Sequence, residues 1–194
     1  EQADASISEL LKYDLLKYTR IEGVQFIYPE AAYNDEKYIA EKLVLLEKTC
    51  AGLSHADIER FILREELEGG ISYAAQQKQA IYDALRSGVM LLTGGPGTGK
   101  TTVVRALLDI FESMGYKVAL AAPTGRAAMR MSAACAREAK TIHRLLEMEY
   151  SENERMHFAR DESNLLGENV IIIDEASMID NALLAALLRA VKPG

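Results

Sequence analysis

A glycine-rich run in the middle of the chain has the residue types and spacing of a phosphate-binding loop. Residues 94–101 read Gly-Gly-Pro-Gly-Thr-Gly-Lys-Thr and match the pattern G-x-x-x-x-G-K-[ST]. Glycines let the backbone curl so that its N–H groups point at phosphate oxygens, and the following helix N-terminus adds partial positive charge. We expect Lys100 to reach the β- and γ-phosphates and Thr101 to offer its hydroxyl to Mg²⁺. The predicted nucleotide contacts in this loop are Gly95, Pro96, Gly97, Thr98, Gly99, Lys100, Thr101 and Thr102.

Two acidic residues follow the most β-branched run of the chain. Asp174 and Glu175 come directly after residues 170–173, which read Val-Ile-Ile-Ile. Ligands of open α/β sheets bind at the carboxyl ends of the strands, so these acids are expected beside the phosphate site. Asp174 would hold Mg²⁺ through water, and Glu175 would orient or deprotonate the attacking water. The sequence therefore predicts a nucleoside triphosphate, Mg²⁺ and hydrolysis, with Lys100, Asp174 and Glu175 as catalytic residues.

The elements around these motifs predict an α/β fold. Short apolar runs at residues 89–92, 118–122 and 170–173 alternate with helical patterns. Continuous apolar strands separated by helices indicate a parallel sheet covered on both faces. We also expect helical segments over residues 126–148 and a loop over the polar residues 151–169.

The first third of the chain predicts short helices instead. Residues 24–28 alternate weakly and are a candidate strand, and a helix is expected to open at Asn34 or Asp35. Another helix is expected to be capped by Ser54 and Asp57 and to end at Gly69-Gly70. We therefore divide the chain into a small, acidic, mostly helical domain (1–70) and a nucleotide-binding lobe (71–194).

Composition excludes several classes of protein. Of 194 residues 49% are hydrophobic, and no apolar run approaches the ~18 residues of a membrane span. The net charge of −7 arises within residues 1–75, which hold 15 acidic and 8 basic residues, so a globally basic nucleic-acid binder is disfavoured. Two cysteines and no visible signal peptide favour a reducing, cytoplasmic location. A local basic stripe remains at residues 125–144.

Five segments together resemble the RecD-like helicases of superfamily 1B, which include the alpha subunit of exodeoxyribonuclease V. The resemblance covers about residues 30–190, and motifs I, Ia and II occur in the family's order. The segments are 77–80 (QKQA, the adenine-reading Q motif), 92–102 (LTGGPGTGKTT, motif I), 122–128 (APTGRAA, motif Ia), 140–146 (KTIHRLL, a DNA-contacting segment) and 173–180 (IDEASMID, motif II).

This resemblance implies a RecA-like P-loop lobe that uses ATP and moves 5′-to-3′ along single-stranded DNA. It implies that Gln77 contacts adenine through its amide, with the neighbouring Gln76 as the rival. It also implies DNA contacts by Thr124, Arg126 and His143. The alternatives are a helix-capping threonine, a solvated arginine and a packing histidine. The remaining basic residues Arg130, Arg137 and Lys140 are interpreted as the solvated face of a helix.

The sequence also departs from the family's pattern. The apolar strand ending in Gly-Asp-x-x-Gln-Leu-Pro, which follows motif II in the family, is missing before the chain stops at Gly194, and Leu165 stands where a proline is expected. The second RecA-like lobe and its arginine would lie beyond this point. We therefore expect an N-terminal fragment, truncated before motif III, that binds nucleotide but is nearly inactive alone.

Two other functions remain open at this point. One is an AAA+-type ATPase that remodels proteins, which shares the loop and the acidic pair but does not explain residues 123–126 or Gln77. The other is a nucleotide-dependent docking subunit whose acidic N-terminal part binds a second protein. For the helicase reading, the expected partners are single-stranded DNA and, as an option, subunits of a nuclease–helicase complex, with no membrane.

Overall fold

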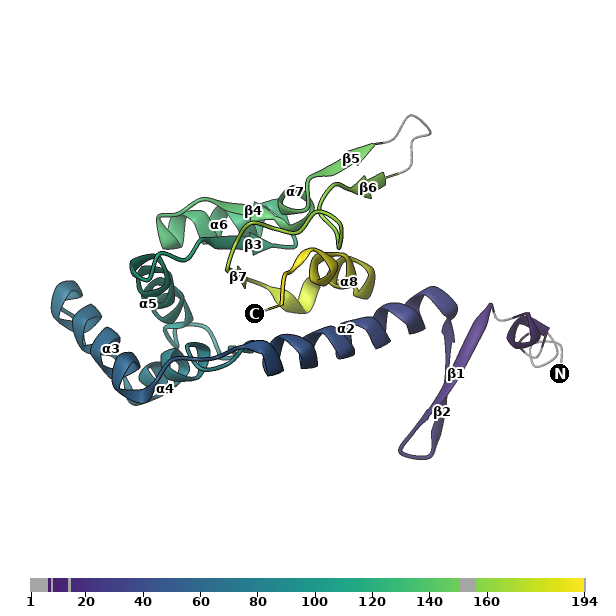
Figure 1. The fold of residues 1–194 in the computed structure, drawn as a ribbon, viewed down its shortest axis with the longest axis horizontal. Helices are drawn as coiled ribbons and strands as arrows, with labels where there is room; N and C mark the ends of the chain where they lie inside the picture. The colour runs from purple at the N-terminus through teal and green to yellow at the C-terminus, as the bar shows by residue number, and fades with distance from the viewer. Residues whose placement is uncertain (1–6, 8, 14, 151–155, 194) are drawn as a thin grey trace.

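The computed structural model describes residues 7, 9–13, 15–150 and 156–193 (Figure 1). Its elements follow the chain in the order β1 (Leu16–Ile21), β2 (Val24–Pro29), α2 (Glu30–Thr49), α3 (His55–Gly69), α4 (Ala75–Ala84), α5 (Lys100–Ser113), β3 (Val118–Ala122), α6 (Gly125–Cys135), β4 (Ala139–Thr141), α7 (Ile142–Leu145), β5 (Met148–Tyr150), β6 (Met156–Phe158), β7 (Val170–Ile173), a 3₁₀ turn η1 (Ala176–Met178) and α8 (Asn181–Ala190).

A parallel sheet forms the centre of the lobe. Its strand order is β4-β3-β7, with Leu120 of β3 opposite Ala139 on one side and Ile172 on the other. The small and apolar residues of β3 suit a central strand, because neither of its faces is exposed to water. The α/β fold with a parallel sheet predicted from the sequence is confirmed.

The two faces of β3 are covered by different helices. Ala119 and Ala121 pack in a buried cluster with Ile142 of α7 and Leu187 of α8. Leu120 points the other way and packs with α5 and α6, because successive strand side chains alternate between faces. The sheet is therefore the middle layer of three, as Figure 1 shows.

A separate core joins α3, α4 and α5. Ile58 and Ile62 of α3 are buried with Ile81 of α4 and Val103 of α5. The predicted capping of α3 is confirmed, since the Ser54 hydroxyl accepts from the Asp57 N–H, and the helix ends at Gly69 before a left-handed Gly70. The domain boundary at residue 70 stays a prediction, and α3 shares this core with elements on the far side of it.

The N-terminal elements extend from the lobe. The hairpin of β1 and β2 is antiparallel and lies at one end of the long helix α2, which runs beside α8 (Figure 1). The predicted strand at 24–28 is confirmed, but the expected helix start at Asn34 or Asp35 is wrong. The helix begins at Glu30, directly after Pro29, whose ψ of 140° is not helical.

The predicted strand at residues 89–92 is wrong, because this segment pairs with no described strand. The Val89 N–H instead donates to the Glu47 carboxylate of α2 at 2.9 Å. Gly88 lies so close to the Leu46 carbonyl oxygen that a Cβ there would be 2.2 Å from it. The start of the segment is thus attached to the end of α2 and not to β7.

Two other expectations also need correction. The helical pattern at 126–148 is interrupted by β4, which is paired to β3 through Leu120, Ala121 and Ala122. The stretch 151–169, expected as a loop, contains β6, which pairs antiparallel with β5; residues 151–155 lie outside the described part.

In the part of the chain that the structure describes, no helix is long and apolar enough to cross a membrane.

Candidate functional site

The glycine-rich loop leads directly into α5. Gly99 is the N-cap of this helix at φ 86°, a left-handed conformation that glycine adopts without steric cost, and no side chain caps the helix. The first backbone N–H groups of α5 are therefore available to an anion. The Lys100 ammonium donates to the carbonyl oxygens of Gly94 at 2.5 Å and Gly95 at 2.9 Å, so it lies over the loop. This arrangement has the donors that a phosphate group needs.

Gln77 lies against this loop. A Cβ built on Gly99 would be only 2.1 Å from the Gln77 Nε2 atom, so no side chain larger than glycine's fits there without displacing the glutamine. The Gln77 Oε1 atom accepts from the Ala74 N–H at 2.9 Å and thereby fixes the side chain at the start of α4. Gln76 is exposed. The structure thus brings Gln77 to the phosphate-binding loop, 22 positions along the chain.

The carboxyl ends of the three parallel strands bring the other candidates to one sheet edge. Thr124 follows β3, His143 follows β4, and Asp174 with Glu175 follows β7. The strand ends are aligned because Ala122 pairs with Thr141 and Ala121 with Ile173. This edge is where open α/β sheets bind ligands.

The two acids after β7 have different surroundings. The Asp174 N–H donates to the Ala121 carbonyl, and the Asp174 carboxylate accepts from the Glu175 N–H at 2.9 Å. Glu175 has φ 57°, an uncommon conformation for a residue with a side chain. Its carboxylate forms an ion pair with Arg130 of α6. Arg130, expected to be simply solvated, therefore contacts a candidate catalytic residue that is 45 positions away.

The three candidate DNA contacts differ in their present roles. The Thr124 hydroxyl accepts from the Ala127 N–H at 3.2 Å and caps α6. Arg126 is exposed on the first turn of that helix. The His143 ring lies 6.0 Å from the Phe158 ring, at a tilt of 53°. The cap and the ring contact agree with the open alternatives and leave DNA binding by these residues a prediction.

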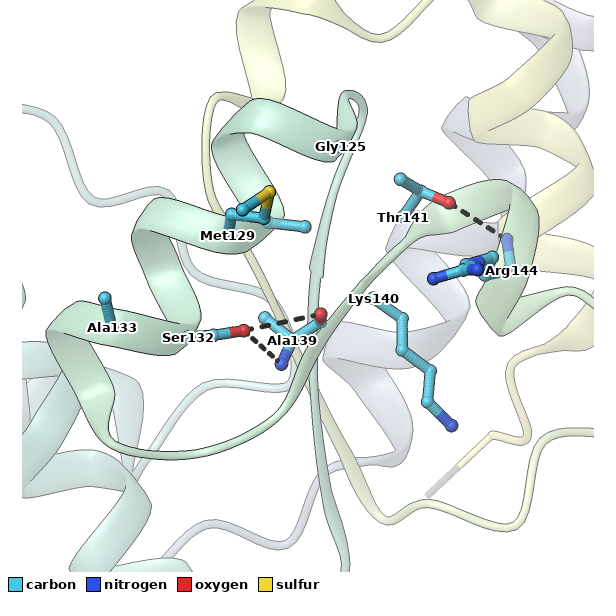
Figure 2. Close-up of a pocket in the computed structure, with 9 residues that line it drawn as sticks. Gly125, Met129, Ser132, Ala133, Ala139, Lys140, Thr141 and Arg144 are labelled. Carbon is cyan, nitrogen blue, oxygen red and sulfur yellow. Dashed lines mark hydrogen bonds between the residues drawn. The ribbon is translucent and has the colours of Figure 1, made fainter.

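A pocket of about 590 Å³ lies between α6 and the segment formed by β4 and α7. Figure 2 shows Ser132 bonded to the backbone of Ala139 across it; the Ser132 hydroxyl accepts from the Ala139 N–H at 2.8 Å. Gly125, Ala128 and Ser132 follow one another at three- and four-residue spacing on one face of α6, a pattern already visible in the sequence, and their small side chains let β4 approach. The lining residues are Gly125, Ala128, Met129, Ser132, Ala133, Ala139, Lys140, Thr141 and Arg144.

The glycine-rich loop and the two acids after β7, Asp174 and Glu175, are predicted to act on one nucleotide but share no hydrogen bond or ion pair among the described residues. Nor do the described residues contain a group of three or more His, Cys, Asp or Glu side chains that could hold a metal ion. A metal bound here would depend on phosphate oxygens, water and the exposed Thr101 hydroxyl, the arrangement that Mg²⁺ favours in nucleotide sites.

A parallel sheet, a glycine-rich loop opening a helix, and acids at the end of a strand of that sheet define a P-loop nucleoside triphosphatase lobe. The chain belongs to the family described as "AAA domain", whose family model matches residues 77–194.

Similarity to curated proteins is more specific. The chain is 40% identical over 142 residues to the RecBCD enzyme subunit RecD of Mycobacterium tuberculosis, covering 61% of this chain and 24% of that protein. It is 40% identical over 121 residues to the ATP-dependent RecD2 DNA helicase of Deinococcus radiodurans, covering 62% of this chain and 16% of that protein. It is 32% identical over 190 residues to the RecBCD enzyme subunit RecD of Mycolicibacterium smegmatis, covering 86% of this chain and 32% of that protein. The resemblance to RecD-like helicases is confirmed, and the match covers between 16% and 32% of the length of these relatives.

Proposed function

We propose that the chain is the ATP-binding part of a RecD-type DNA helicase. The complete helicase would couple ATP hydrolysis to 5′-to-3′ translocation on single-stranded DNA in recombination and repair. The observation that carries the proposal is the similarity to proteins named RecD and RecD2 DNA helicase, together with a family match over residues 77–194, which contain the glycine-rich loop and both strand-end motifs. The 194 residues alone bind nucleotide, turn over very slowly and do not unwind duplexes.

The residues of the loop fit Mg²⁺ and ATP. The uncapped start of α5 offers its first backbone N–H groups, and Gly99 has no room for a Cβ beside Gln77. The Lys100 ammonium can exchange its carbonyl partners for phosphate oxygens. Thr101 and, through water, Asp174 would hold Mg²⁺, which neutralises charge on the phosphates when it is bound. The Gln77 side-chain amide, held beside the loop, is suited to contact the N6 and N7 atoms of adenine. Residues 95–102 would surround the phosphates.

Hydrolysis needs a group that orients water. Glu175 supplies a carboxylate at the strand end next to Asp174, and such a residue accepts a proton from the attacking water. Lys100 stabilises the charge that develops on the transferred phosphate. The chain's own contribution is thus to bind the phosphates, orient the water and accept its proton.

DNA binding belongs to the same sheet edge. Thr124, Arg126 and His143 follow neighbouring strands, and the pocket between α6 and β4 adds Lys140 and Arg144. Hydroxyl and guanidinium groups are suited to phosphate contacts with single-stranded DNA. Subunits of a nuclease–helicase complex are the proposed protein partners, because several relatives are named as RecBCD subunits. We place the protein in the cytoplasm.

The test is ATP hydrolysis by the complete protein with and without single-stranded DNA. We expect a large stimulation by DNA that Lys100→Ala abolishes, because the variant loses the charge that holds the phosphates. Lys117→Ala, which removes an exposed lysine directly before β3, is the matched control and should behave as wild type.

The outcomes separate the two enzyme classes. Hydrolysis that is indifferent to DNA but lost in Lys100→Ala would contradict the helicase and favour a protein-remodelling AAA+-type ATPase, which the family description "AAA domain" also admits. Thr124, Arg126 and His143 would then be left with structural roles only.

A further inference from the structure

An ion pair links the helix of the proposed DNA segment to the proposed water-activating residue. Arg130 lies one turn after Arg126 on α6, and its guanidinium binds the Glu175 carboxylate at the end of β7. The Arg130 side chain is 61% exposed and that of Glu175 is 35% exposed. Residues four apart on a helix lie on one face, so Arg130 and Arg126 are reached from the same side.

The backbone of Glu175 is fixed, and the position of its carboxylate depends on Arg130. Glu175 has a left-handed φ of 57°, and its N–H donates to the Asp174 carboxylate. Among the residues that the structure describes, Arg130 is the partner of the Glu175 side chain. A carboxylate held by a guanidinium on α6 has less freedom to accept a proton from water at the phosphate site.

We propose that Arg130 is a positioning residue that restrains Glu175 until single-stranded DNA binds along α6. A DNA phosphate is a strong competitor for the Arg130 guanidinium, because arginine binds phosphate in bidentate geometry. An ion pair this exposed is weak enough to be exchanged. DNA binding then releases Glu175, and this explains how DNA stimulates hydrolysis. The inference rests on the proposed roles of Glu175 and of the DNA segment.

The experiment uses Arg130→Gln in the complete protein. Hydrolysis is measured without DNA and with saturating oligo-deoxythymidine, per molecule competent to bind ATP. We expect the rate without DNA to rise about two- to fivefold, the range set by the strength of an exposed ion pair. The rate with DNA should stay close to wild type, so the stimulation ratio falls. Arg130→Lys keeps the charge and should return the rate without DNA toward wild type.

Two controls isolate the contact. Arg137→Gln breaks an exposed ion pair with Glu112 and Asp109 of α5, away from Glu175, and should leave both rates unchanged. The double variant Arg130→Gln, Glu175→Gln should be as slow as Glu175→Gln alone, because the effect acts through that carboxylate.

An unchanged or lower rate without DNA in Arg130→Gln overturns the restraint, as does a double variant faster than Glu175→Gln. Failure of DNA to stimulate the wild type is a different result. It overturns the helicase proposal and the release step, whereas a rise without DNA in Arg130→Gln would still report the restraint itself.

Discussion

At the residue scale, the two neighbouring glutamines at the start of α4 show how a single contact distinguishes equivalent residues. Gln76 and Gln77 have the same chemistry, but only Gln77 lies against the backbone of Gly99. Its Oε1 atom is bonded to the Ala74 N–H, and the amide is thereby oriented toward the loop. The adenine contact proposed for Gln77 therefore has a defined starting geometry.

Gln77→Ala should weaken the preference for ATP over GTP. A bidentate amide contact to adenine is worth about 1–3 kcal/mol of discrimination, so we expect the preference to fall by roughly one to two orders of magnitude. Nucleotide affinities measured by calorimetry check this. Gln76→Ala is the matched control, and an equal loss in both variants would remove Gln77 from this role.

Glu175→Gln should retain ATP binding and slow hydrolysis in the complete protein. The amide keeps the shape of the side chain but cannot accept a proton, and positioned general bases contribute about 10²–10⁴-fold. Single-turnover hydrolysis together with an ATP-binding isotherm separates the two effects. Undiminished turnover would assign the water-activating role to another group.

At the element scale, α4 is held against α3 by one carboxylate. Glu66 of α3 accepts from the Lys78 ammonium at 2.9 Å and from the Tyr73 N–H at 2.7 Å. These contacts, the Lys78 bond first, hold the pKa of Glu66 below its usual range. The element that carries Gln77 is thus positioned by charge as well as by the buried core of Ile58 and Ile81.

The depressed pKa of Glu66 predicts a pH-dependent stability. Because the folded-state pKa lies below the unfolded one, the contribution is complete above the unfolded pKa and is lost as pH falls through the folded one. Glu66→Gln should therefore lower the thermal midpoint of the chain near pH 7, and the difference from wild type should shrink toward pH 3. Glu68→Gln, at an exposed position of α3, should show neither effect. A difference that is constant with pH would contradict the assignment.

At the scale of the whole molecule, Arg189 of α8 connects the long helix α2 to the parallel-sheet lobe. Its guanidinium lies 4.1 Å from the centre of the Tyr38 ring on α2 and 3.2 Å from the Glu162 carboxylate, with Asp35 at 4.0 Å. Burial, followed by the bond to Glu162, raises the pKa of Tyr38. The long helix α2 is therefore attached to α8 by a polar contact as well as by packing.

Arg189→Ala should loosen α2 from the lobe. Losing a cation–π contact at a partly exposed site costs about 0.5–1 kcal/mol, and α2 should become more sensitive to limited proteolysis. Arg60→Ala, which removes an exposed arginine paired within α3, is the control. Equal cleavage rates in α2 for wild type and Arg189→Ala would contradict this attachment.

The sequence by itself determined the features that depend on local order. The glycine-rich loop, β3, β7 and the capped helix α3 follow from spacing, because backbone freedom, capping and strand patterning act between residues a few positions apart.

The tertiary structure decided which distant residues meet. It paired Arg130 with Glu175, placed the Gln77 side chain against Gly99, and formed the pocket between α6 and β4. It also bonded the Val89 N–H to the Glu47 carboxylate, and residues 89–92 pair with no described strand. These outcomes depend on how helices and strands pack. The residue types of an apolar run such as 89–92 do not specify which groups its backbone will bond.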